Sequence, residues 1–227
     1  MHRPFRLALI TLACAAGAAT AQVAPSTSLA EQMRAMLGKP AAAGTAPVVS
    51  PVPAAATTPG APVIASGPAQ VRQSATELAQ RFPATHRAAM TKAFEESFAF
   101  WQKLETQLGL TPNDVGAATA AFIAGNYAAF MQQQVPDEDF KALVAQMQGL
   151  LARNPAFAQS GPAAKRSMYE QLAMVGTFMA VYREQLKAKP NPAEEVNFRN
   201  AAKANLEAGV GLAVERIQIG RQGLVLR

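Results

Sequence analysis

Hydrophobic residues recur every three or four positions along most of the chain from residue 71 onwards, which is the period of an α-helix. The clearest example is the segment 85–108, whose apolar residues are spaced by four, four, three, three and four positions: Met90, Phe94, Phe98, Trp101, Leu104 and Leu108. Gly109 follows directly and is a favourable residue for ending a helix. The pattern predicts a helix that buries one face and ends at Leu108.

The same period predicts further helices, and the residues at their starts resemble helix caps. Ser74 and Glu77 have the spacing of a capping box, which would open a short helix. Thr111 is a suitable cap for a helix that begins at Pro112. The additional predicted helices cover residues 74–82, 112–133, 136–153, 162–189 and 192–207.

The segment 112–133 differs from the others because it carries no charged residue between Val115 and Met131. Its many Ala and Gly residues allow neighbouring backbones to come close, and its aromatic residues fill the remaining space. A helix that is apolar on all sides is typical of the centre of a helical protein. We therefore expect this helix to be buried in the middle of the domain.

The C-terminal tail follows a different period, because apolar and polar residues alternate over positions 216–219. A turn is predicted at residues 220–223, followed by a second apolar run at 224–226. The fold class predicted for residues 71–227 is therefore all-α: a helical bundle of about five to six helices with a short C-terminal β-hairpin or extended strap.

Residues 1–21 have the three-part plan of a secretory signal peptide, with a basic start, an apolar run and a tail of small residues. We expect cleavage between Ala21 and Gln22 and an exported, periplasmic protein. In the alternative interpretation Cys14 is acylated as the first residue of a lipoprotein, but Thr11 stands where such signals usually carry Leu. No stretch reaches the roughly 20 apolar residues of a membrane helix, so no transmembrane segment is expected.

Residues 22–38 are predicted to form a short amphipathic helix. Its apolar face comprises Leu29, Met33, Met36 and Leu37. The helix is shorter than the roughly 12 to 15 residues that an isolated helix needs, so it either docks, on its own domain or on a partner, or frays. Residues 39–70 are rich in Pro and Ala and are predicted to be a disordered linker.

The composition excludes several kinds of site. The chain has one Cys and two His, and Cys14 and His2 lie within the signal peptide. The mature chain would keep only His86, which excludes disulfides, Cys nucleophiles and zinc sites with two or more His or Cys ligands. Its paired carboxylates fall in first helical turns or on exposed faces, where helix-end electrostatics explain them. We therefore expect no catalytic residue, no metal site and no cofactor.

The net charge gives little support to nucleic-acid binding. The formal charge is +6, and it falls to about +4 when Arg3 and Arg6 leave with the signal peptide. The remaining basic residues are scattered singly along helices, without a stripe interleaved with aromatic residues. An ordinary solvated surface explains this distribution.

Asn126 is the polar residue of the central helix that most needs an explanation. Its neighbours three and four positions away are apolar, so its amide is expected to be buried and to require hydrogen-bond partners. The simpler interpretation is that it bonds a neighbouring helix and fixes the register between the two. The functional interpretation is a pocket lined by Trp101, Asn126 and Tyr127 that holds a small ligand or a partner's side chain.

Three blocks of the domain are distinctive: Phe94–Leu110, the block AAFIAGNY at Ala120–Tyr127, and Tyr169–Gly176. Together they resemble a bacterial family of exported helical proteins that is catalogued as uncharacterised, and the resemblance covers about residues 71–226. The chain departs from the family pattern around Ala208–Gly211, where the last helix meets the strap. The resemblance implies an exported helical protein and no particular activity.

The function is therefore unknown from the sequence, and three hypotheses follow. The first is a non-enzymatic periplasmic interaction or scaffold module that binds an envelope protein partner through residues 22–38. Deleting residues 22–70 would then abolish partner binding and leave the bundle folded. The second is a small-ligand carrier that uses a bundle cavity near Asn126 and Tyr127. The third, an enzyme, requires Glu105 and Glu170 to converge in a cleft.

Overall fold

The computed structural model describes residues 29, 33 and 61–227. From Val71 to Val210 the chain forms seven α-helices: α2 (Val71–Ala79), α3 (Ala84–Leu108), α4 (Val115–Met131), α5 (Asp137–Ala152), α6 (Pro155–Gln159), α7 (Pro162–Ala188) and α8 (Pro192–Val210). A 3-10 turn at Val214–Arg216 leads into an antiparallel hairpin of β1 (Ile217–Gly220) and β2 (Gly223–Leu226). The predicted all-α class and the C-terminal hairpin are confirmed, and the short α6 is the helix that the pattern did not predict.

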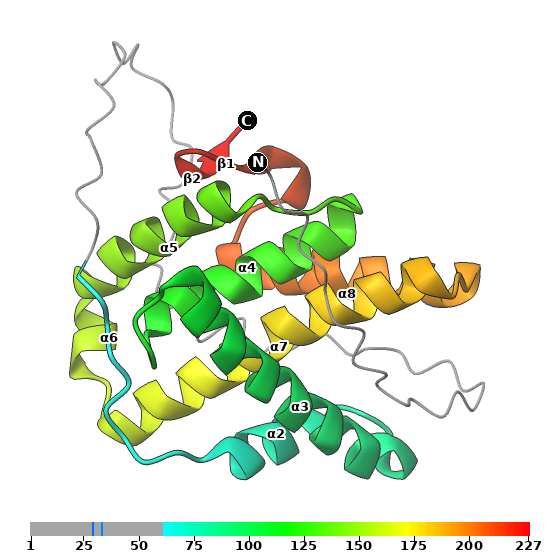
Figure 1. The fold of residues 1–227 in the computed structure, drawn as a ribbon, viewed down its shortest axis with the longest axis horizontal. Helices are drawn as coiled ribbons and strands as arrows, with labels where there is room; N and C mark the ends of the chain where they lie inside the picture. Colours follow the sequence, from blue (N-terminus) through cyan, green and yellow to red (C-terminus); the bar gives the residue numbers. More distant parts are fainter. Residues whose placement is uncertain (1–28, 30–32, 34–60) are drawn as a thin grey trace.

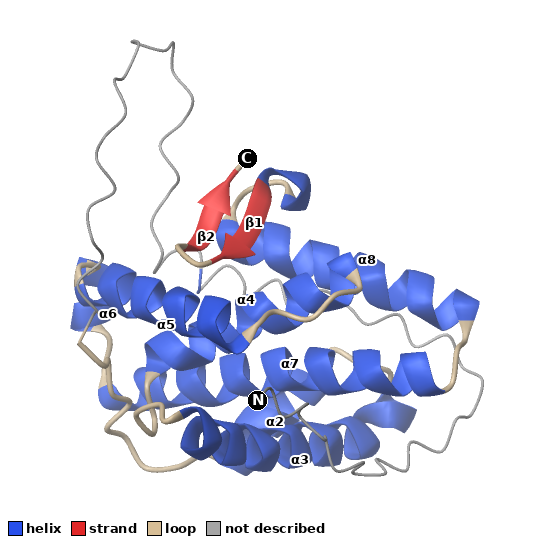
Figure 2. Cartoon of the chain, turned by 45° about the horizontal axis from the view of Figure 1, so that its top comes forward, coloured by secondary structure: helices blue, strands red, loops and turns tan. Residues whose placement is uncertain are grey.

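The uncharged helix α4 lies at the centre of the bundle and contacts α5, α7 and α8 (Figure 1). Every residue from Val115 to Ala129 is buried, as its composition predicts. The long helix α7 runs beside α4 and packs on its other side against α2 and α3. The hairpin lies against α5, across the molecule from α2 and α3 (Figure 2). No helix in the described part of the chain is both long and apolar enough to cross a membrane.

Helices α4 and α7 approach each other through glycine. A Cβ atom on Gly125 would lie 2.0 Å from the carbonyl oxygen of Gly176. A Cβ atom on Gly176 would lie 2.3 Å from the carbonyl oxygen of Ala121. Because side chains larger than hydrogen do not fit between the two backbones, these two glycines set the distance between the central helices.

The start of α4 differs from the prediction that it begins at Pro112. The helix begins at Val115, and Asp114 is its cap: the Oδ1 atom accepts a hydrogen bond from the backbone N–H of Gly116 at 2.8 Å. Asn113 has a φ of 62°, in the left-handed region, so the backbone turns sharply just before the cap. Thr111 and Asp114 are both residues that can cap a helix. The sequence pattern predicted Thr111 as the cap of this helix, whereas the cap in the structure is Asp114.

The start of α2 also differs from the prediction. The helix begins at Val71, three residues before Ser74, so the predicted capping box with Glu77 is not formed. The Ser74 hydroxyl instead donates to the carboxylate of Glu170 in α7 at 2.7 Å. Glu77 accepts a hydrogen bond from the Gln171 side chain of the same helix at 2.8 Å. Ser74 and Glu77 therefore bond side chains of α7, and not the backbone at the start of their own helix as the capping-box pattern predicted.

Residues 61–70, expected to be part of the linker, lie against the bundle. The backbone of Val63 accepts from Val115 N–H, and Ala65 N–H donates to the Asn113 carbonyl, both at 2.9 Å. Further along, the backbone N–H of Gln70 donates to Glu170 at 2.9 Å. The folded part therefore extends upstream of residue 71 to at least Val63. The predicted signal peptide 1–21 and linker residues 39–60 lie outside the described residues.

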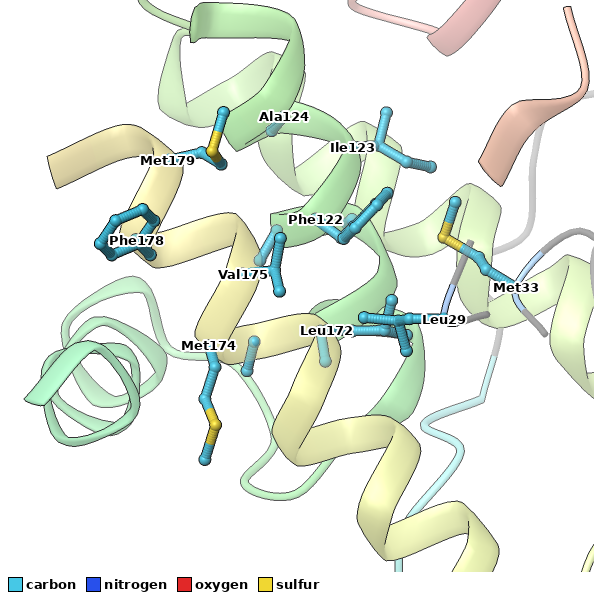
Figure 3. Close-up of a cluster of buried hydrophobic side chains, with 14 of the residues drawn as sticks. Leu29, Met33, Phe122, Ile123, Ala124, Leu172, Met174, Val175, Phe178 and Met179 are labelled. Carbon is cyan, nitrogen blue, oxygen red and sulfur yellow. The ribbon is translucent and has the colours of Figure 1, made fainter. Parts of the chain in front are cut away.

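Two residues of the predicted helix 22–38 are described, Leu29 and Met33, and both have helical backbone and at most 1% of their surface exposed. They belong to the hydrophobic cluster that contains Phe122 and Leu172 (Figure 3). A Cβ atom on Gly209 would lie 2.1 Å from Cε of Met33, so the methionine methyl group sits directly on the α8 backbone. Of the alternatives for this segment, the described residues support docking on its own domain.

Candidate functional site

A cavity of about 540 Å³ lies between α3, α4 and α7, with the first turn of α5 at one end. The larger apolar residues of its wall include Phe100, Trp101, Leu104, Phe140, Phe178 and Val181. Small-molecule sites in proteins typically have volumes of about 300–1,000 Å³ and mostly apolar walls with a few polar groups. The cavity has the size and the character of such a site.

Small residues on two helices leave this space open. Ala121, Ala124, Gly125 and Ala128 of α4 line the cavity, and Gly176 and Ala180 of α7 lie opposite them. Their side chains are too short to fill the volume between the helices, while the glycine contact fixes how far apart the backbones lie. The same small residues that let α4 and α7 touch therefore create the cavity.

Arg183 is the buried charged residue among those that line the cavity, with 2% of its surface exposed. Its Nη1 atom donates to the carbonyl oxygen of Gln133 at 2.9 Å, and its Nη2 atom is paired with the carboxylate of Glu184. Its Nε atom has no hydrogen-bond partner within the described part of the chain. A buried N–H group without an acceptor costs on the order of 1–3 kcal/mol.

Thr177 supplies a second polar group of the same kind. Its hydroxyl is buried in the wall of the cavity and has no partner among the described residues. Buried Ser and Thr residues elsewhere in the bundle donate to the carbonyl oxygen four residues earlier, as Ser97 and Thr119 do, both at 2.7 Å. The unpartnered hydroxyl of Thr177 is therefore an exception among these residues.

Three of the residues that line the cavity carry carboxylates that are at least partly exposed to solvent. Asp137 is exposed, and the side chains of Glu96 and Glu184 are 39% and 36% exposed. All three residues line the cavity. Glu184 is paired with Arg183 and Lys187, and Glu96 lies 3.8 Å from Lys92. Two of the three carboxylates are therefore paired with basic residues, whereas Asp137 has no such pair within the described residues.

Trp101, which lines the cavity, is the first member of a chain of buried hydrogen bonds that continues to Tyr169 and Glu105. Trp101 Nε1 donates to the Tyr169 hydroxyl at 3.3 Å, and that hydroxyl donates to Glu105 Oε2 at 2.7 Å. Burial of the Glu105 carboxyl raises its pKa to about 7, although the hydrogen bond from Tyr169 acts in the opposite direction. Burial also raises the pKa of Tyr169. Glu105 can therefore gain or lose a proton near neutral pH, next to the wall of the cavity.

Glu170 is fully buried in a separate set of contacts that hold the start of α2. Its two carboxylate oxygens accept from Gln70 N–H and from the Ser74 hydroxyl, and Arg166 Nε lies 3.9 Å away. Neither Glu105 nor Glu170 lines the cavity, and each binds different groups. The two carboxylates therefore form no shared cleft of the kind that the enzyme hypothesis requires.

Of the three site residues proposed from sequence, Trp101 lines the cavity, while Asn126 and Tyr127 do not. Asn126 is fully buried on the side of α4 that faces α8. Its Nδ2 atom donates to the Phe122 carbonyl at 2.8 Å, and its Oδ1 atom accepts from Asn205 Nδ2 at 2.9 Å. This is the geometry of the simpler interpretation, a polar contact that fixes the register of two helices. The cavity therefore contains one of the three candidate residues, Trp101, and lies along a different face of α4 from Asn126.

Sequence reasoning missed Arg183 and Thr177. Arg183 did carry a signal, because it lies four residues after Met179 and three before Leu186, on the apolar stripe of its own helix. A charge on a buried face requires an explanation, and the cavity provides one. Thr177 carried no such signal, since its unused hydroxyl is visible only once the neighbouring carbonyl groups are placed.

The comparisons with known proteins add a family and no activity. The model of DUF6683, a family of unknown function, matches residues 1–227, and the chain belongs to this family. No match was found among curated proteins or among solved structures. Within the described residues, no three His, Cys, Asp or Glu side chains gather closely enough to hold a metal ion. The geometry of the cavity is therefore the basis for a function.

Proposed function

We propose that this member of a family of unknown function is a non-enzymatic carrier that binds a small, mostly apolar ligand in the cavity between α3, α4 and α7. The observation that supports the proposal best is the cavity itself, which has a volume of about 540 Å³ and whose lining residues include two with buried polar atoms that lack partners in the described chain, Thr177 and Arg183. Such atoms are uncommon in folded proteins.

The scaffold hypothesis relied on an accessible apolar face of residues 22–38. Leu29 and Met33 of that face are buried in the core of the protein itself. While they are docked they cannot bind an envelope partner. The deletion of residues 22–70 would also remove Val63 and Gln70, which bond the bundle, and so it does not separate partner binding from folding.

A cavity-filling substitution tests the proposal directly. Ala180 lines the cavity and is half-buried, so Ala180→Phe would place a ring in the volume available to a ligand. Ala188→Phe, at the exposed end of the same helix, is the matched control. We expect the parent protein and the control to bind the apolar fluorophore N-phenylnaphthylamine, and Ala180→Phe to bind it at least tenfold more weakly. Equal affinity in all three proteins would contradict the proposal.

The natural ligand can be sought by native mass spectrometry of the protein purified gently from its own cells. A small mass retained by the parent protein and lost from Ala180→Phe would support the carrier function. Retention of the same mass by both proteins would place its site elsewhere.

We further propose that the carrier is a bacterial protein that acts after export to the periplasm. The support is the signal-like sequence of residues 1–21. The intact mass of the mature protein tests this, because cleavage after Ala21 leaves Gln22 as the first residue. An acylated chain that begins at Cys14 would instead indicate a lipoprotein, and an uncleaved chain would contradict export by this signal.

A further inference from the structure

Glu105 and Trp101 lie one turn apart on α3, and both bond the same hydroxyl group of α7. Trp101 Nε1 donates to the Tyr169 hydroxyl at 3.3 Å, and that hydroxyl donates to Glu105 Oε2 at 2.7 Å. Each of the three residues has at most 3% of its surface exposed. A carboxyl group that does not itself line the cavity is therefore connected, through one hydroxyl group, to a residue that does.

The position of the Glu105 carboxyl group favours its neutral form. Oε2 accepts from Tyr169, but Oε1 is buried and has no hydrogen-bond partner in the described part of the chain. Glu105 also lies in the last turn of α3, where its backbone carbonyl accepts from Leu110 N–H at 2.8 Å. A negative charge is unfavourable at this end of a helix. Loss of the proton therefore creates a buried charge with few donors around it.

The titratable and charged groups around Glu105 come from α7 and from the start of α4. Burial is the main influence and raises the pKa of Glu105 to about 7, while the hydrogen bond from Tyr169 lowers this pKa and the charge of Asp114 raises it. Arg166 of α7 lies over the Tyr169 ring, 5.6 Å from its centre, and pairs with Glu170 at 3.9 Å. Glu105 therefore changes its charge near neutral pH.

The end of α3 that carries Glu105 also forms part of the cavity wall. Trp101, Leu104 and Leu108 of this segment line the cavity. The hydroxyl group that holds Trp101 against α7 is the same one that donates to Glu105. The packing of α3 on α7 is therefore a condition both for the burial of the carboxyl group and for the shape of the cavity.

We propose that Glu105 is a proton switch for the cavity: its neutral form keeps the end of α3 packed on α7, and its ionised form loosens this contact and weakens ligand binding. This inference rests on the proposed carrier function. An ionised carboxylate requires water or other donors, which the closed packing does not provide. By linkage, a ligand that binds the closed form makes Glu105 hold its proton more tightly. The carrier thus binds its ligand at low pH and releases it as the pH rises.

The pH dependence of probe binding by the full chain tests the switch. N-phenylnaphthylamine is uncharged over the whole range, so its own charge does not contribute. We expect its affinity to be roughly fivefold or more weaker at about pH 8.5 than at about pH 5.5, with a midpoint near the pKa of Glu105. Calorimetry near pH 7, in two buffers of different ionisation enthalpy, should show that binding takes up protons.

Three variants assign the effect. Glu105→Gln stays neutral, so its affinity should be independent of pH and close to that of the parent at low pH, and its binding should take up no protons. Tyr169→Phe removes a hydrogen bond that favours the carboxylate, so the midpoint should move to higher pH. His86→Gln is the control, because histidine side chains ordinarily titrate in this range. His86 lies at the other end of α3, outside the cavity lining, and its variant should behave as the parent does.

Circular dichroism at each pH verifies that the proteins are folded. If Glu105→Gln or Tyr169→Phe does not fold, the affinity profile and the proton uptake of the parent and of His86→Gln decide.

The outcomes separate the switch from the carrier function. Binding of the probe with the same affinity at every pH and without proton uptake would overturn the switch and leave the carrier function standing. A pH dependence that persists in Glu105→Gln, or that disappears in His86→Gln, would assign the titration to another group and also overturn the switch. Absence of binding at every pH would overturn both proposals.

Discussion

At the scale of single residues, the bundle contains buried polar groups of two kinds, those with partners and those without. Asn126, Glu170 and Asp114 are each bonded across helix boundaries. Arg183 Nε and Thr177 Oγ1 are not bonded within the described chain, and both belong to residues that line the cavity. Since buried polar groups without partners reduce stability, these two atoms lower the stability of the protein.

Thr177→Val tests that cost in the free protein. The substitution keeps the shape of the side chain and removes an unbonded hydroxyl, so we expect the free energy of unfolding to rise by about 1 kcal/mol. Thr119→Val is the matched control, because the Thr119 hydroxyl donates to the Val115 carbonyl and its loss should lower stability by about 1 kcal/mol. Urea unfolding followed by circular dichroism measures both. Changes of the same sign would show that Thr177 is satisfied in the free protein.

Glu105 makes the stability depend on pH. The pKa of this carboxyl is raised from an ordinary 4.5 to about 7 by burial, so between these values the folded state binds the proton more tightly than the unfolded state. The contribution of Glu105 to stability is therefore greatest below about pH 4.5, and roughly 3 kcal/mol of it is lost as the pH rises from there through about 7. Glu105→Gln, which cannot ionise, should lose most of this dependence.

Urea unfolding of the parent protein and of Glu105→Gln at several pH values between about 4.5 and 8 measures the difference. The Trp101 emission provides a second readout, because Trp101 is joined to Glu105 through Tyr169. A pH profile that is the same in both proteins would assign the titration to another group.

At the scale of helices, the glycine contact between α4 and α7 is the feature on which the cavity depends. Gly125→Ala would place a methyl group 2.0 Å from a backbone oxygen of Gly176, and a backbone atom cannot move aside as a flexible side chain can. We expect a loss of about 3 kcal/mol or more, together with a change in probe binding as the helices separate.

Gly149→Ala is the control for a helical glycine without such a neighbour. Its Cβ would meet only the Arg153 side chain, at 3.7 Å, and alanine favours helix, so a gain of up to about 1 kcal/mol is expected. Thermal unfolding of both variants checks the contrast. Similar effects at the two positions would mean that the contact between α4 and α7 is looser than described.

The helices themselves were predictable because their period is a local property of the sequence. The end of α3 at Gly109 and the cap of α8 at Asn191 also follow from local residues, and both are confirmed. The start of α2 was not predictable, because Ser74 bonds Glu170, which lies 96 positions along the chain. The cavity was not predictable from the sequence either, because it also depends on contacts between distant segments. It exists only where α3, α4 and α7 bring their small residues together.

At the scale of the whole molecule, segments that precede α2 are tied to the bundle at several points. Residues 63–65 pair with the start of α4, and Gln70 bonds α7. Arg166 of α7 donates to the Gly67 carbonyl at 2.8 Å, between these two points. Leu29 and Met33 lie in the core near α4 and α8. The described residues that precede α2 therefore contribute to the stability of the bundle.

A double-mutant cycle tests the docking of residue 33. Gly209→Ala alone would place a methyl group 2.1 Å from Met33 Cε and 3.3 Å from Phe122 Cε1, so it should lower the free energy of unfolding. Met33→Ala alone removes a buried side chain and should cost about 2 kcal/mol or more. In the double variant the alanine at position 209 has room and favours helix. We expect the two effects to be non-additive by about 1 kcal/mol or more.

The control cycle pairs Met33→Ala with Gly149→Ala, whose neighbouring side chain is Arg153 and not Met33, and it should be additive within about 0.5 kcal/mol. Chemical unfolding of the four proteins in each cycle gives both coupling energies. Coupling at Gly209 but not at Gly149 would place Met33 on α8 in solution. Additivity in both cycles would mean that residue 33 does not occupy this part of the core, and the face around Phe122 and Gly209 would then be open to another segment.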